Sequence, residues 1–249
     1  LKALVMQSDI IIPLAAIVGA PACDNNPEAA RAVNLDCIKD IISWLGPEQR
    51  IIYPNTNSGY GQSTTVCTEE TPLNPISLYG QLKDEAEAVV RTHPNHVVFR
   101  LATVFGVSPR HRLDLLVNTL VYDACRKGKL TIFDDAFMRN YIHINDIVRA
   151  FNLAISFYNS KGLKNQVYNL GNDSINMSKG DLAEKVAGLT GCEIEKIAKT
   201  DPDQRDYVVS SAKLYSTGFQ CEFDLDYGIR ELMNYYRFVD KIPDYMKNI

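Results

Sequence analysis

Short apolar runs alternate with helical patterns in the first part of the chain, and this alternation restricts the possible folds more than any other feature. Apolar runs occupy 9–18, 50–54 and 96–104. A continuous apolar run bounded by turns is typical of a strand covered on both faces, so 9–18 is predicted to be a central strand. Strand and helix following each other at this spacing predict a parallel sheet with helices on both faces.

Proline and glycine mark the limits of the segments between these runs. A helix is predicted from about Pro27, in its first turn, to about Leu45, and Gly46-Pro47 ends it. Gly19-Ala20-Pro21 is predicted to be a loop. The stretch 55–76 is rich in Thr, Ser, Asn, Gly and Pro and predicts a long loop, which in a compact domain is usually functional or disordered.

Beyond Gly106 the pattern is less regular, but further elements are still predicted. They are a basic turn at 108–112, a helix at 115–125, a short strand at 130–133, a helix from an Asn145 N-cap to Phe157, a strand at 166–170, a helix opened by a Ser178/Asp181 capping box, and a terminal helix at 225–238.

Composition excludes several classes of function. Of the residues, 46% are hydrophobic and the net charge is −4, with no basic stripe, so nucleic acid is not an expected partner. The six cysteines are scattered, and Cys37 and Cys125 lie in helical apolar patterns, which predicts buried thiols in a reducing, cytoplasmic compartment. No apolar run is long enough to span a membrane. Asp134-Asp135 is interpreted as a turn rather than a metal site.

The best candidate for chemistry is a tyrosine and a lysine in the helix that follows the long loop. Tyr79 and Lys83 are four residues apart, so on a helix their side chains share one face. A lysine near a tyrosine is expected to lower the pKa of the phenol, because positive charge stabilises the phenolate. Thr56 adds a hydroxyl directly after the strand at 50–54, so the three residues suit oxidation or reduction of an alcohol.

Taken alone, these residues have ordinary explanations as well. A tyrosine followed four residues later by a lysine is common on a solvated helix, and Gly80 is a poor helix residue. Thr56 could equally be a loop hydroxyl that caps the backbone. The rest of the sequence therefore has to decide between the two interpretations.

Further motifs, taken in order, carry a resemblance to a known family. Over essentially its whole length the chain resembles the extended short-chain dehydrogenases/reductases of the nucleotide-sugar epimerase/dehydratase group. Each motif is weak evidence alone, but eight in the expected order are strong evidence. They are Leu14-Ala15-Ala16, Asn34, Thr56 with Tyr60-Gly61, Tyr79-x-x-x-Lys83, Arg100-x-x-x-Val104-Phe105-Gly106, Arg139-x-Tyr141-Ile142-His143-x-x-Asp146, Tyr168-Asn169-x-Gly171 and Arg205-Asp206.

The resemblance implies an α/β fold. A Rossmann-type parallel sheet, truncated at its N-terminal side, would bind NAD or NADP, and a smaller α/β domain would bind a nucleotide-sugar. The expected cofactor-binding domain is 1–106 plus about 141–165. The substrate-binding domain would be 107–140 and 166–249, interleaved with it. A homodimer is expected by family analogy alone.

The resemblance also implies roles for individual residues. Thr56, Tyr79 and Lys83 would be catalytic, with Tyr79 as the acid/base, and no metal is expected. The expected cofactor-binding residues are Leu14, Ala15, Ala16, Asn34, Tyr79, Lys83 and Ala102. The expected substrate-binding residues are Asn57, Ser58, Thr103, Asn118, Arg139 and Arg205, the two arginines holding a diphosphate.

Some of these assignments compete with simpler ones. Arg139 and Arg205 could instead form surface ion pairs with Asp135 or Asp206. His143, between two isoleucines, is interpreted as a structural histidine rather than a catalytic one.

The chain departs from the family pattern in two respects. The Gly-rich turn that binds the cofactor's pyrophosphate is not found, so we expect the sequence to be part of a longer gene product. Asn57 and Ser58 follow Thr56, where dehydratases of this group carry Asp and Glu. An amide and a hydroxyl cannot supply that acid and base at neutral pH, so 4,6-dehydration is disfavoured. Thr103 replaces the asparagine of many epimerases, which leaves the sugar undefined.

Three functions follow as hypotheses. The leading one is an NAD(P)-dependent nucleotide-sugar epimerase that works by hydride transfer through a keto-sugar intermediate. The second is an NADPH-dependent 4-keto-sugar nucleotide reductase using the same three residues. The third, from another class, is a non-catalytic family member that binds a nucleotide-sugar or a partner protein.

Overall fold

A four-stranded parallel sheet forms the centre of the first half of the molecule. The computed structural model describes residues 1–199 and 203–239. The strands lie in the order β1-β2-β4-β8, and all neighbouring pairs are parallel. Their bounds are β1 Ile10–Ile11, β2 Arg50–Thr56, β4 His96–Leu101 and β8 Gln166–Leu170. The sequence-based prediction of a parallel α/β sheet is therefore confirmed.

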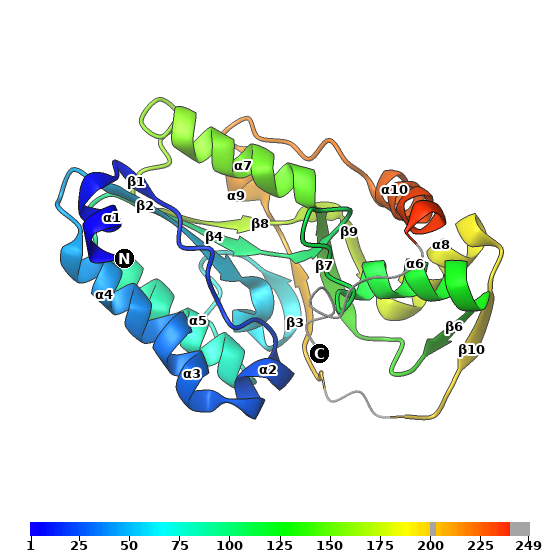
Figure 1. Ribbon diagram of the computed structural model, residues 1–249. Helices are drawn as coiled ribbons and strands as arrows, with labels where there is room; N and C mark the ends of the chain where they lie inside the picture. Colours follow the sequence, from blue (N-terminus) through cyan, green and yellow to red (C-terminus); the bar gives the residue numbers. More distant parts are fainter. Residues whose placement is uncertain (200–202, 240–249) are drawn as a thin grey trace.

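Helices cover both faces of this sheet. Helices α4 (Cys37–Trp44) and α5 (Leu78–Val90) lie on one face and α7 (Ile144–Ser156) on the other (Figure 1). Alternate strand residues point to the two faces. Ile51, Tyr53 and Val98 pack with α4 and α5. Ile52, Val97 and Phe99 pack with α7. Since each such side chain contributes about 1.5–3 kcal/mol when fully buried, both faces stabilise the sheet.

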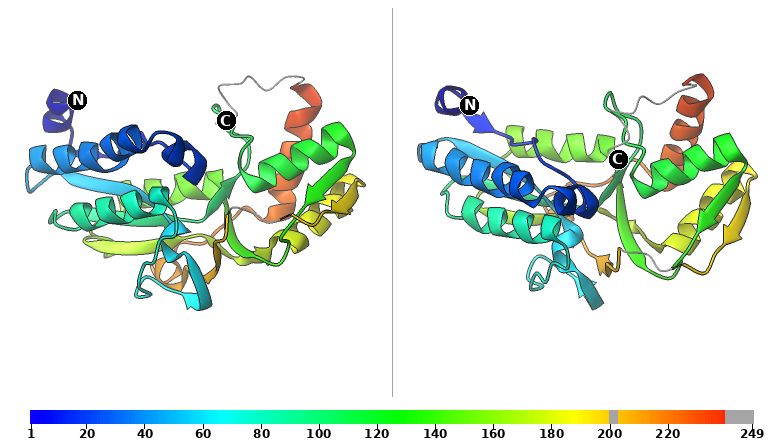
Figure 2. Two further views of the ribbon diagram at one scale, coloured as in Figure 1. Left: turned by 90° about the horizontal axis from the view of Figure 1, so that it is seen from below. Right: turned by 60° about the horizontal axis from the view of Figure 1, so that its bottom comes forward.

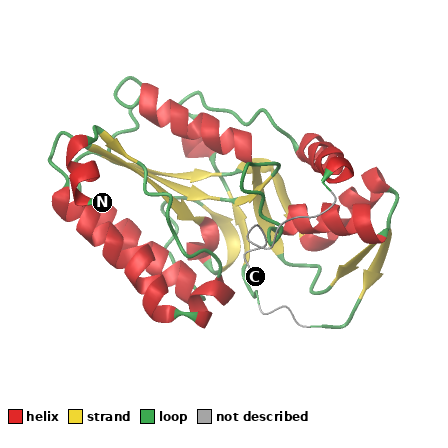
Figure 3. Cartoon of the chain, viewed as in Figure 1, coloured by secondary structure: helices red, strands yellow, loops and turns green. Residues whose placement is uncertain are grey.

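The second half of the molecule is built from helices and smaller sheets at the opposite end (Figure 2). Strand β7 (Met138–His143) pairs with β5 (Thr103–Phe105) in parallel and with β9 (Asn172–Ser178) antiparallel. Helices α6 (Leu116–Lys127), α8 (Lys179–Thr190) and α10 (Leu225–Phe238) share one apolar core. Two further pairs are β6 (Lys129–Ile132) with β10 (Glu193–Lys196), and β3 (Gln62–Cys67) with β11 (Asp206–Val209). The strands of the main sheet lie between helices, whereas the β6–β10 pair lies at the outer edge of the second half (Figure 3).

The remaining α-helices in the described residues are short. They are α1 (Lys2–Gln7), α2 (Ala20–Asn25), α3 (Pro27–Arg31) and α9 (Ala212–Tyr215). A π-helical turn, Ala32–Asp36, joins α3 to α4, so the predicted helix over 27–45 exists as one helical run of three segments.

The predicted central strand over 9–18 is wrong. Only Ile10 and Ile11 are in a strand, and that strand is at the edge of the described sheet. Pro13 has no N–H for a ladder, and the amide of Asn34 binds both the N–H and the C=O of Ile17, at 2.8 Å each. The backbone is therefore satisfied by a side chain rather than by a neighbouring strand. The predicted loop at Gly19-Ala20-Pro21 is also wrong, since α2 begins at Ala20.

Three further boundaries differ from the predictions. The strand over 96–104 divides at Ala102, where the chain leaves β4 and starts β5 in another sheet. Strand β8 pairs with β4, so 166–170 belongs to the main sheet, whereas the sequence-based prediction grouped it with 107–140. The segment 55–76 contains a 3-10 turn, Asn57–Tyr60, and strand β3 rather than a loop alone.

His143 has a structural role at the start of α7. Its Nδ1 accepts a hydrogen bond from the Asn145 N–H at 3.2 Å, so His143 and not Asn145 is the N-cap. The imidazole is buried, stacks on Phe223 and lies 3.0 Å from Glu231 of α10. The interpretation of His143 as structural thus fits its position. The predicted capping box at Ser178 and Asp181 is confirmed, whereas Cys125, predicted to be buried, is exposed.

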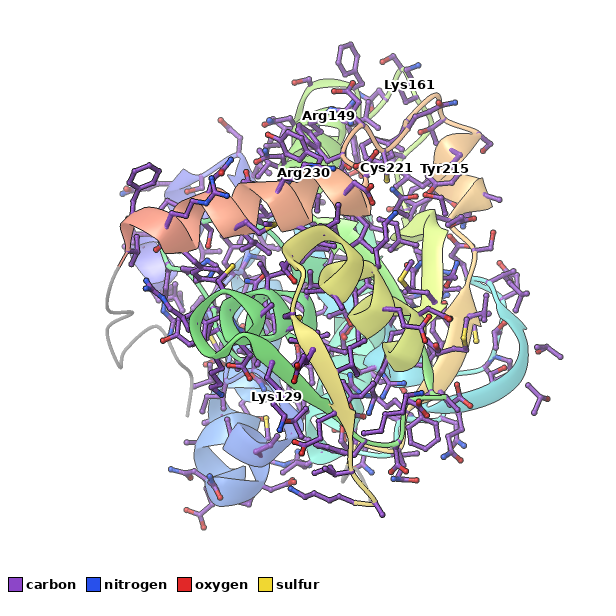
Figure 4. The ribbon with its side chains drawn as sticks, turned by 90° about the vertical axis from the view of Figure 1, so that its right-hand side faces the viewer. Lys129, Arg149, Lys161, Tyr215, Cys221 and Arg230 are labelled. Carbon is purple, nitrogen blue, oxygen red and sulfur yellow. The ribbon has the colours of Figure 1, made fainter. Side chains whose placement is uncertain are left out.

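A buried carboxylate on α7 binds the segment that leads into α10. Asp146 in α7 accepts the backbone N–H groups of Glu222 and Phe223 at 3.0 and 3.1 Å, and Arg149 bridges Asp146 and Glu222. Figure 4 shows Arg149 in the same upper region as Cys221 and Tyr215, where this segment crosses the molecule. These contacts orient α10 against the second half.

A buried ion pair lies at the carboxyl end of the main sheet. Arg100 of β4 binds both carboxylate oxygens of Glu87 of α5, at 2.7 and 3.1 Å, and both side chains are almost fully buried. Asn55 donates to the same carboxylate, and the Arg100 guanidinium also donates to the Tyr60 hydroxyl at 3.0 Å. The Tyr60 hydroxyl donates in turn to Asn169 of β8 at 2.6 Å. The network joins β2, β4, β8, α5 and the 57–60 turn.

None of the helices in the described ranges 1–199 and 203–239 is long and apolar enough to cross a membrane. The same residues contain no cluster of three metal-ligating side chains.

We predict that Glu87→Gln destabilises the protein by about 3–5 kcal/mol, because it leaves the buried Arg100 without a countercharge. Urea denaturation would show a lower midpoint at an unchanged m-value. Glu85→Gln is the matched control, since Glu85 is half exposed and lies 3.9 Å from Arg31, a pair worth at most about 1 kcal/mol. Equal losses in the two variants would contradict the role assigned to the buried pair.

Candidate active site

Thr56 and the Tyr79–Lys83 pair meet where β2 ends and α5 begins. Thr56 is the last residue of β2, and the 3-10 turn Asn57–Tyr60 follows it directly. Ser77 caps α5 by accepting from the Gly80 N–H, so Tyr79 lies in the first turn of the helix. A Cβ at Gly80 would lie 2.9 Å from Pro75 and 3.4 Å from the Ser58 carbonyl. Glycine is therefore what allows α5 to approach this turn so closely, despite its low helix propensity.

The hydroxyls of Thr56 and Ser58 form one hydrogen-bonded unit. Thr56 Oγ1 donates to Ser58 Oγ at 3.0 Å and accepts from the Ser58 N–H at 3.1 Å. Arg205, far along the chain, donates from Nη1 to the same Ser58 oxygen. Its remaining nitrogens bind the carboxylate of Asp203. The arginine predicted to bind diphosphate thus lies beside the predicted catalytic threonine.

The Asp203–Arg205 turn is held in place by β7. Arg139 donates to the Arg205 carbonyl and pairs with Asp203 at 3.3 Å, and the N–H of Met138 donates to Asp206 at 2.8 Å. Burial alone would raise the pKa of Asp203, but the hydrogen bonds and charge of Arg205 hold it well below its usual range. Asp203 is thus ionised at neutral pH. It replaces Asp135 and Asp206 as the ion-pair partner of both arginines.

Lys83 is buried and contacts the backbone of β2. Its ammonium donates to the Pro54 carbonyl at 2.7 Å and lies 4.0 Å from the centre of the Tyr53 ring. Burial lowers the pKa of Lys83 to about 7, with Glu87 opposing the change. The ammonium has three donors, and among the described residues only the Pro54 carbonyl accepts a hydrogen bond from it, which leaves capacity for a ligand.

The pKa of Tyr79 differs from the prediction. Burial raises it to about 12, while the charges of Arg112 and Arg205 act to lower it. Lys83 is not among the groups that shift it, so the prediction that Lys83 lowers the pKa of Tyr79 is wrong for this structure. The lysine is turned toward Pro54 and Tyr53 instead. Tyr79 and Lys83 are neighbours on α5, but the Lys83 ammonium donates to the Pro54 carbonyl of β2 instead of interacting with the Tyr79 phenol.

The residues predicted to contact the cofactor are divided between surface and interior. Leu14 is 73% exposed and Ala15 is also exposed, just after β1, while Ala16 is half-buried. Asn34 is buried, and its amide is committed to the backbone of Ile17. Ala102 is buried between β4 and β5. Contact of these residues with a cofactor stays a prediction, and Asn34 has a structural role that its position in the sequence did not reveal.

Some of the residues predicted to bind substrate already form hydrogen bonds within the protein, and others do not. Asn118 accepts from the Gly106 N–H and donates to the Arg112 carbonyl, so its amide anchors the loop between them. Asn57 is 1% exposed and its amide has no hydrogen-bond partner among the described residues. Thr103 begins β5. Substrate contact stays a prediction for all three.

Two features of the site were not predicted from sequence. Arg112 was interpreted as part of a basic turn, yet its charge reaches Tyr79. The contact between Arg205 and Ser58 joins residues 147 positions apart, and no local pattern indicates it. The basic character of 108–112 was the one available signal.

A hollow of about 490 Å³ lies elsewhere, beside α5, β4 and β8. Arg100 and Glu87 form part of its wall, whereas Thr56, Tyr79 and Lys83 do not.

A comparison with protein families identifies the family to which the chain belongs. Residues 1–171 match the family described as "NAD dependent epimerase/dehydratase family". An uncharacterized UDP-glucose epimerase of Bacillus subtilis is 29% identical over 160 residues, covering 60% of this chain and 49% of that protein. The chain thus spans about half the length of this relative.

Solved structures show the same fold. One is a UDP-glucuronic acid 4-epimerase from Bacillus cereus, in complex with UDP-glucuronic acid and NAD, at 21% identity and a TM-score of 0.82, covering 95% of this chain and 77% of that one. Another is a dTDP-glucose 4,6-dehydratase from Streptomyces venezuelae with NAD bound, at 18% identity and a TM-score of 0.80, covering 95% and 76%. Epimerases and dehydratases therefore share this architecture.

We predict that Lys83 makes stability depend on pH in a defined window. The lysine of the unfolded chain holds its proton up to its ordinary pKa of 10.5, whereas burial lowers the pKa in the folded protein to about 7. Between these values the unfolded state binds more protons, so the free energy of unfolding rises as pH increases from about 7 to about 10. Lys83→Met should lack this rise in denaturant titrations at several pH values, while Lys39→Met, on the surface, should keep it. Parallel curves for Lys83→Met and the natural sequence would contradict the shift.

Proposed function

Because this chain belongs to the NAD dependent epimerase/dehydratase family, we propose that it acts as an NAD(P)-dependent nucleotide-sugar epimerase. The single observation that carries the proposal is the junction of β2 and α5. There a hydroxyl pair, Thr56 with Ser58, lies against the helix turn that holds Tyr79, and the buried cation Lys83 lies one turn further on. Such a set can remove or return the proton of a sugar hydroxyl.

The site has features that suit a dinucleotide at its open side. Exposed apolar Leu14 and Ala15 follow β1 at the carboxyl edge of the sheet, where ligands of open α/β sheets bind. Lys83 has donor capacity for the ribose hydroxyls. NAD, when bound, supplies a hydride acceptor and the positive charge of its oxidised ring. Lys83 and Tyr79 would hold the nicotinamide end, and we assign no residue of this chain to the pyrophosphate.

The protein's own groups define the proton transfer. In the first half-reaction Tyr79 takes the proton of a sugar hydroxyl that is hydrogen-bonded to the Thr56–Ser58 pair. In the second half-reaction, after the keto-sugar has turned over, Tyr79 returns the proton to the carbonyl oxygen, and the hydride would return to the opposite face of the carbonyl carbon. Burial raises the pKa of Tyr79 to about 12, so the phenol is protonated at neutral pH and the phenolate that would act as the base is scarcely populated. Added positive charge near the phenol is needed for the oxidative half-reaction, since opposite charge favours ionisation.

Dehydration is disfavoured by the groups beside Thr56. Asn57 and Ser58 offer an amide and a hydroxyl, and neither exchanges a proton at neutral pH. The Streptomyces dehydratase resembles this chain in fold at 18% identity, a level that carries no argument about the reaction.

A 4-keto-sugar nucleotide reductase is the second candidate. The same three residues, Thr56, Tyr79 and Lys83, would serve a reaction that runs in one direction only, in which Tyr79 donates a proton. A homodimer stays a prediction from family analogy. A cytoplasmic location stays a prediction from the cysteine pattern, and a purely binding role stays the third hypothesis.

We predict that Tyr79→Phe lowers turnover of a nucleoside-diphosphate sugar by about 10²–10⁴-fold, the usual contribution of a general acid/base. Product formation from UDP-glucose would be followed by NMR. Tyr227→Phe, which removes an exposed hydroxyl on α10, serves as the control with unchanged turnover. Full activity of Tyr79→Phe would end the catalytic assignment, and binding of UDP-glucose with no conversion in the natural sequence would support the binding-only alternative.

We predict that epimerisation proceeds without net use of reduced cofactor, since each hydride removed is returned. Absorbance of NAD(P)H during conversion of UDP-glucose should stay constant. Stoichiometric loss of NADPH with a 4-keto-sugar nucleotide would instead identify the reductase.

A further inference from the structure

The ammonium of Lys83 lies over the face of a buried aromatic ring. Its Nζ is 4.0 Å from the centre of the Tyr53 ring and donates to the Pro54 carbonyl at 2.7 Å. Tyr53 is 0% exposed and Lys83 is 5% exposed. A cation over an aromatic face is attracted by the negative charge of that face, and the attraction is strongest where both groups are shielded from water. The burial of both groups therefore makes this contact a strong one of its kind.

The hydroxyl of Tyr53 takes no part in this contact. Its oxygen is buried and has no hydrogen-bond partner among the described residues. A buried tyrosine usually finds a partner for its hydroxyl, and a buried donor without one costs free energy. Phenylalanine would supply the same ring face without that cost. The ring itself, and not the hydroxyl, is thus the part of Tyr53 that acts on Lys83.

Lys83 is the group in this region whose charge changes near neutral pH. The inward-facing ionisable groups on the elements packed around it are Tyr79 and Glu87 of α5, Tyr53 of β2, Arg100 of β4, Tyr60 of the 57–60 turn and Cys23 of α2. Glu87 and Arg100 form a buried ion pair. Burial raises the pKa values of the three tyrosines and of Cys23, so all four are neutral at pH 7.

The charge of Lys83 is therefore sensitive to its surroundings. Burial lowers the pKa of Lys83 to about 7, with Glu87 opposing the change. A group that is half charged at neutral pH responds to any added or lost stabilisation of its charged form. The Tyr53 ring supplies such stabilisation.

The same strand end holds Lys83 and presents Thr56. Tyr53 and Pro54 are consecutive residues of β2, and Thr56 is its last residue. The strand contacts the lysine through a ring and a carbonyl, so the place of the ammonium is fixed relative to the threonine.

We propose that Tyr53 is a positioning residue, whose ring holds the Lys83 ammonium against β2 and stabilises its charged form during turnover. This deepens, and rests on, the proposed function, in which Lys83 holds the nicotinamide end of the cofactor. The charged ammonium has three donors for this task, and the neutral amine has one fewer.

Ring-fluorinated phenylalanines at position 53 test the contact, because fluorine withdraws electrons from the ring face and changes the shape of the ring little. The Lys83 side chain is titrated by NMR in protein with labelled lysines, and Lys83→Met assigns its signal. Tyr53→Phe should leave the midpoint of the titration unchanged. A trifluorinated ring should lower the midpoint by about one pH unit, a loss of about ten-fold in proton affinity, because the charged form loses its attraction to the ring.

Turnover of UDP-glucose should follow the titration. Tyr53→Phe should keep the kcat of the natural sequence. The trifluorinated ring should lower kcat at pH 7 by about five-fold, since the charged fraction of Lys83 falls from about one half to about one tenth, and lower pH should restore it relative to Tyr53→Phe. A purely structural role of Tyr53 would give a loss that does not depend on pH.

Tyr158 provides the matched control. Arg50 lies over its ring at 3.8 Å, and its hydroxyl is likewise buried without a partner among the described residues. Its ring packs against the opposite face of the main sheet from Tyr53. The same series of rings at position 158 should change neither the Lys83 titration nor turnover. Thermal unfolding of each variant shows whether it is folded.

Two results would overturn the proposal. One is a Lys83 midpoint that is the same across the ring series at position 53. The other is a midpoint that falls with fluorination while kcat at pH 7 stays unchanged. If Tyr79→Phe still abolishes turnover in either case, the proposed function stands and only the role of Tyr53 fails. The titration needs no substrate, so it decides the contact between Tyr53 and Lys83 even if Tyr79→Phe is fully active and the proposed function has failed.

Discussion

The ion pair between Arg100 and Glu87 is the interaction on which the site depends most. A charge in the interior is tolerated only when it is paired and its remaining hydrogen-bonding groups are satisfied. Here the partners come from β4 and α5, and Asn55 and Tyr60 complete the shell. Breaking any one of these contacts would leave a desolvated polar group behind. The network therefore fixes the ends of the strands relative to the helix that carries Tyr79 and Lys83.

The 57–60 turn connects this buried network to the candidate catalytic residues. Tyr60 extends from one end of the turn into the buried ion pair, while Ser58 binds Thr56 and Arg205. Arg205 belongs to the second half of the molecule, where Asp203 and Arg139 hold it. The turn is thus the place where the main sheet and the second half contact each other through charge, and a rigid scaffold on both sides is what preorganised donors require.

Much of the fold followed from periodicity, which is a local property. The apolar runs at 50–54 and 96–104 and the pattern after Tyr79 predicted strands and a helix that the structure contains, although the second run divides into β4 and β5. The failures lie where a distant group replaces a local partner. Asn34 binds the backbone of Ile17 where a strand was predicted, and His143 caps α7 in place of Asn145. In both cases a side chain captured a backbone group that the local pattern had assigned to another partner.

The sequence by itself determined which residues could do chemistry, since the four-residue spacing of Tyr79 and Lys83 and the order of motifs are readable along the chain. It also carried the family membership. Only the tertiary structure decided how those residues are tuned. The pKa of Tyr79 is set by burial, Arg112 and Arg205 rather than by Lys83, and Lys83 itself binds Pro54. Electrostatic effects depend on distances through space and on desolvation, and spacing along one helix specifies neither.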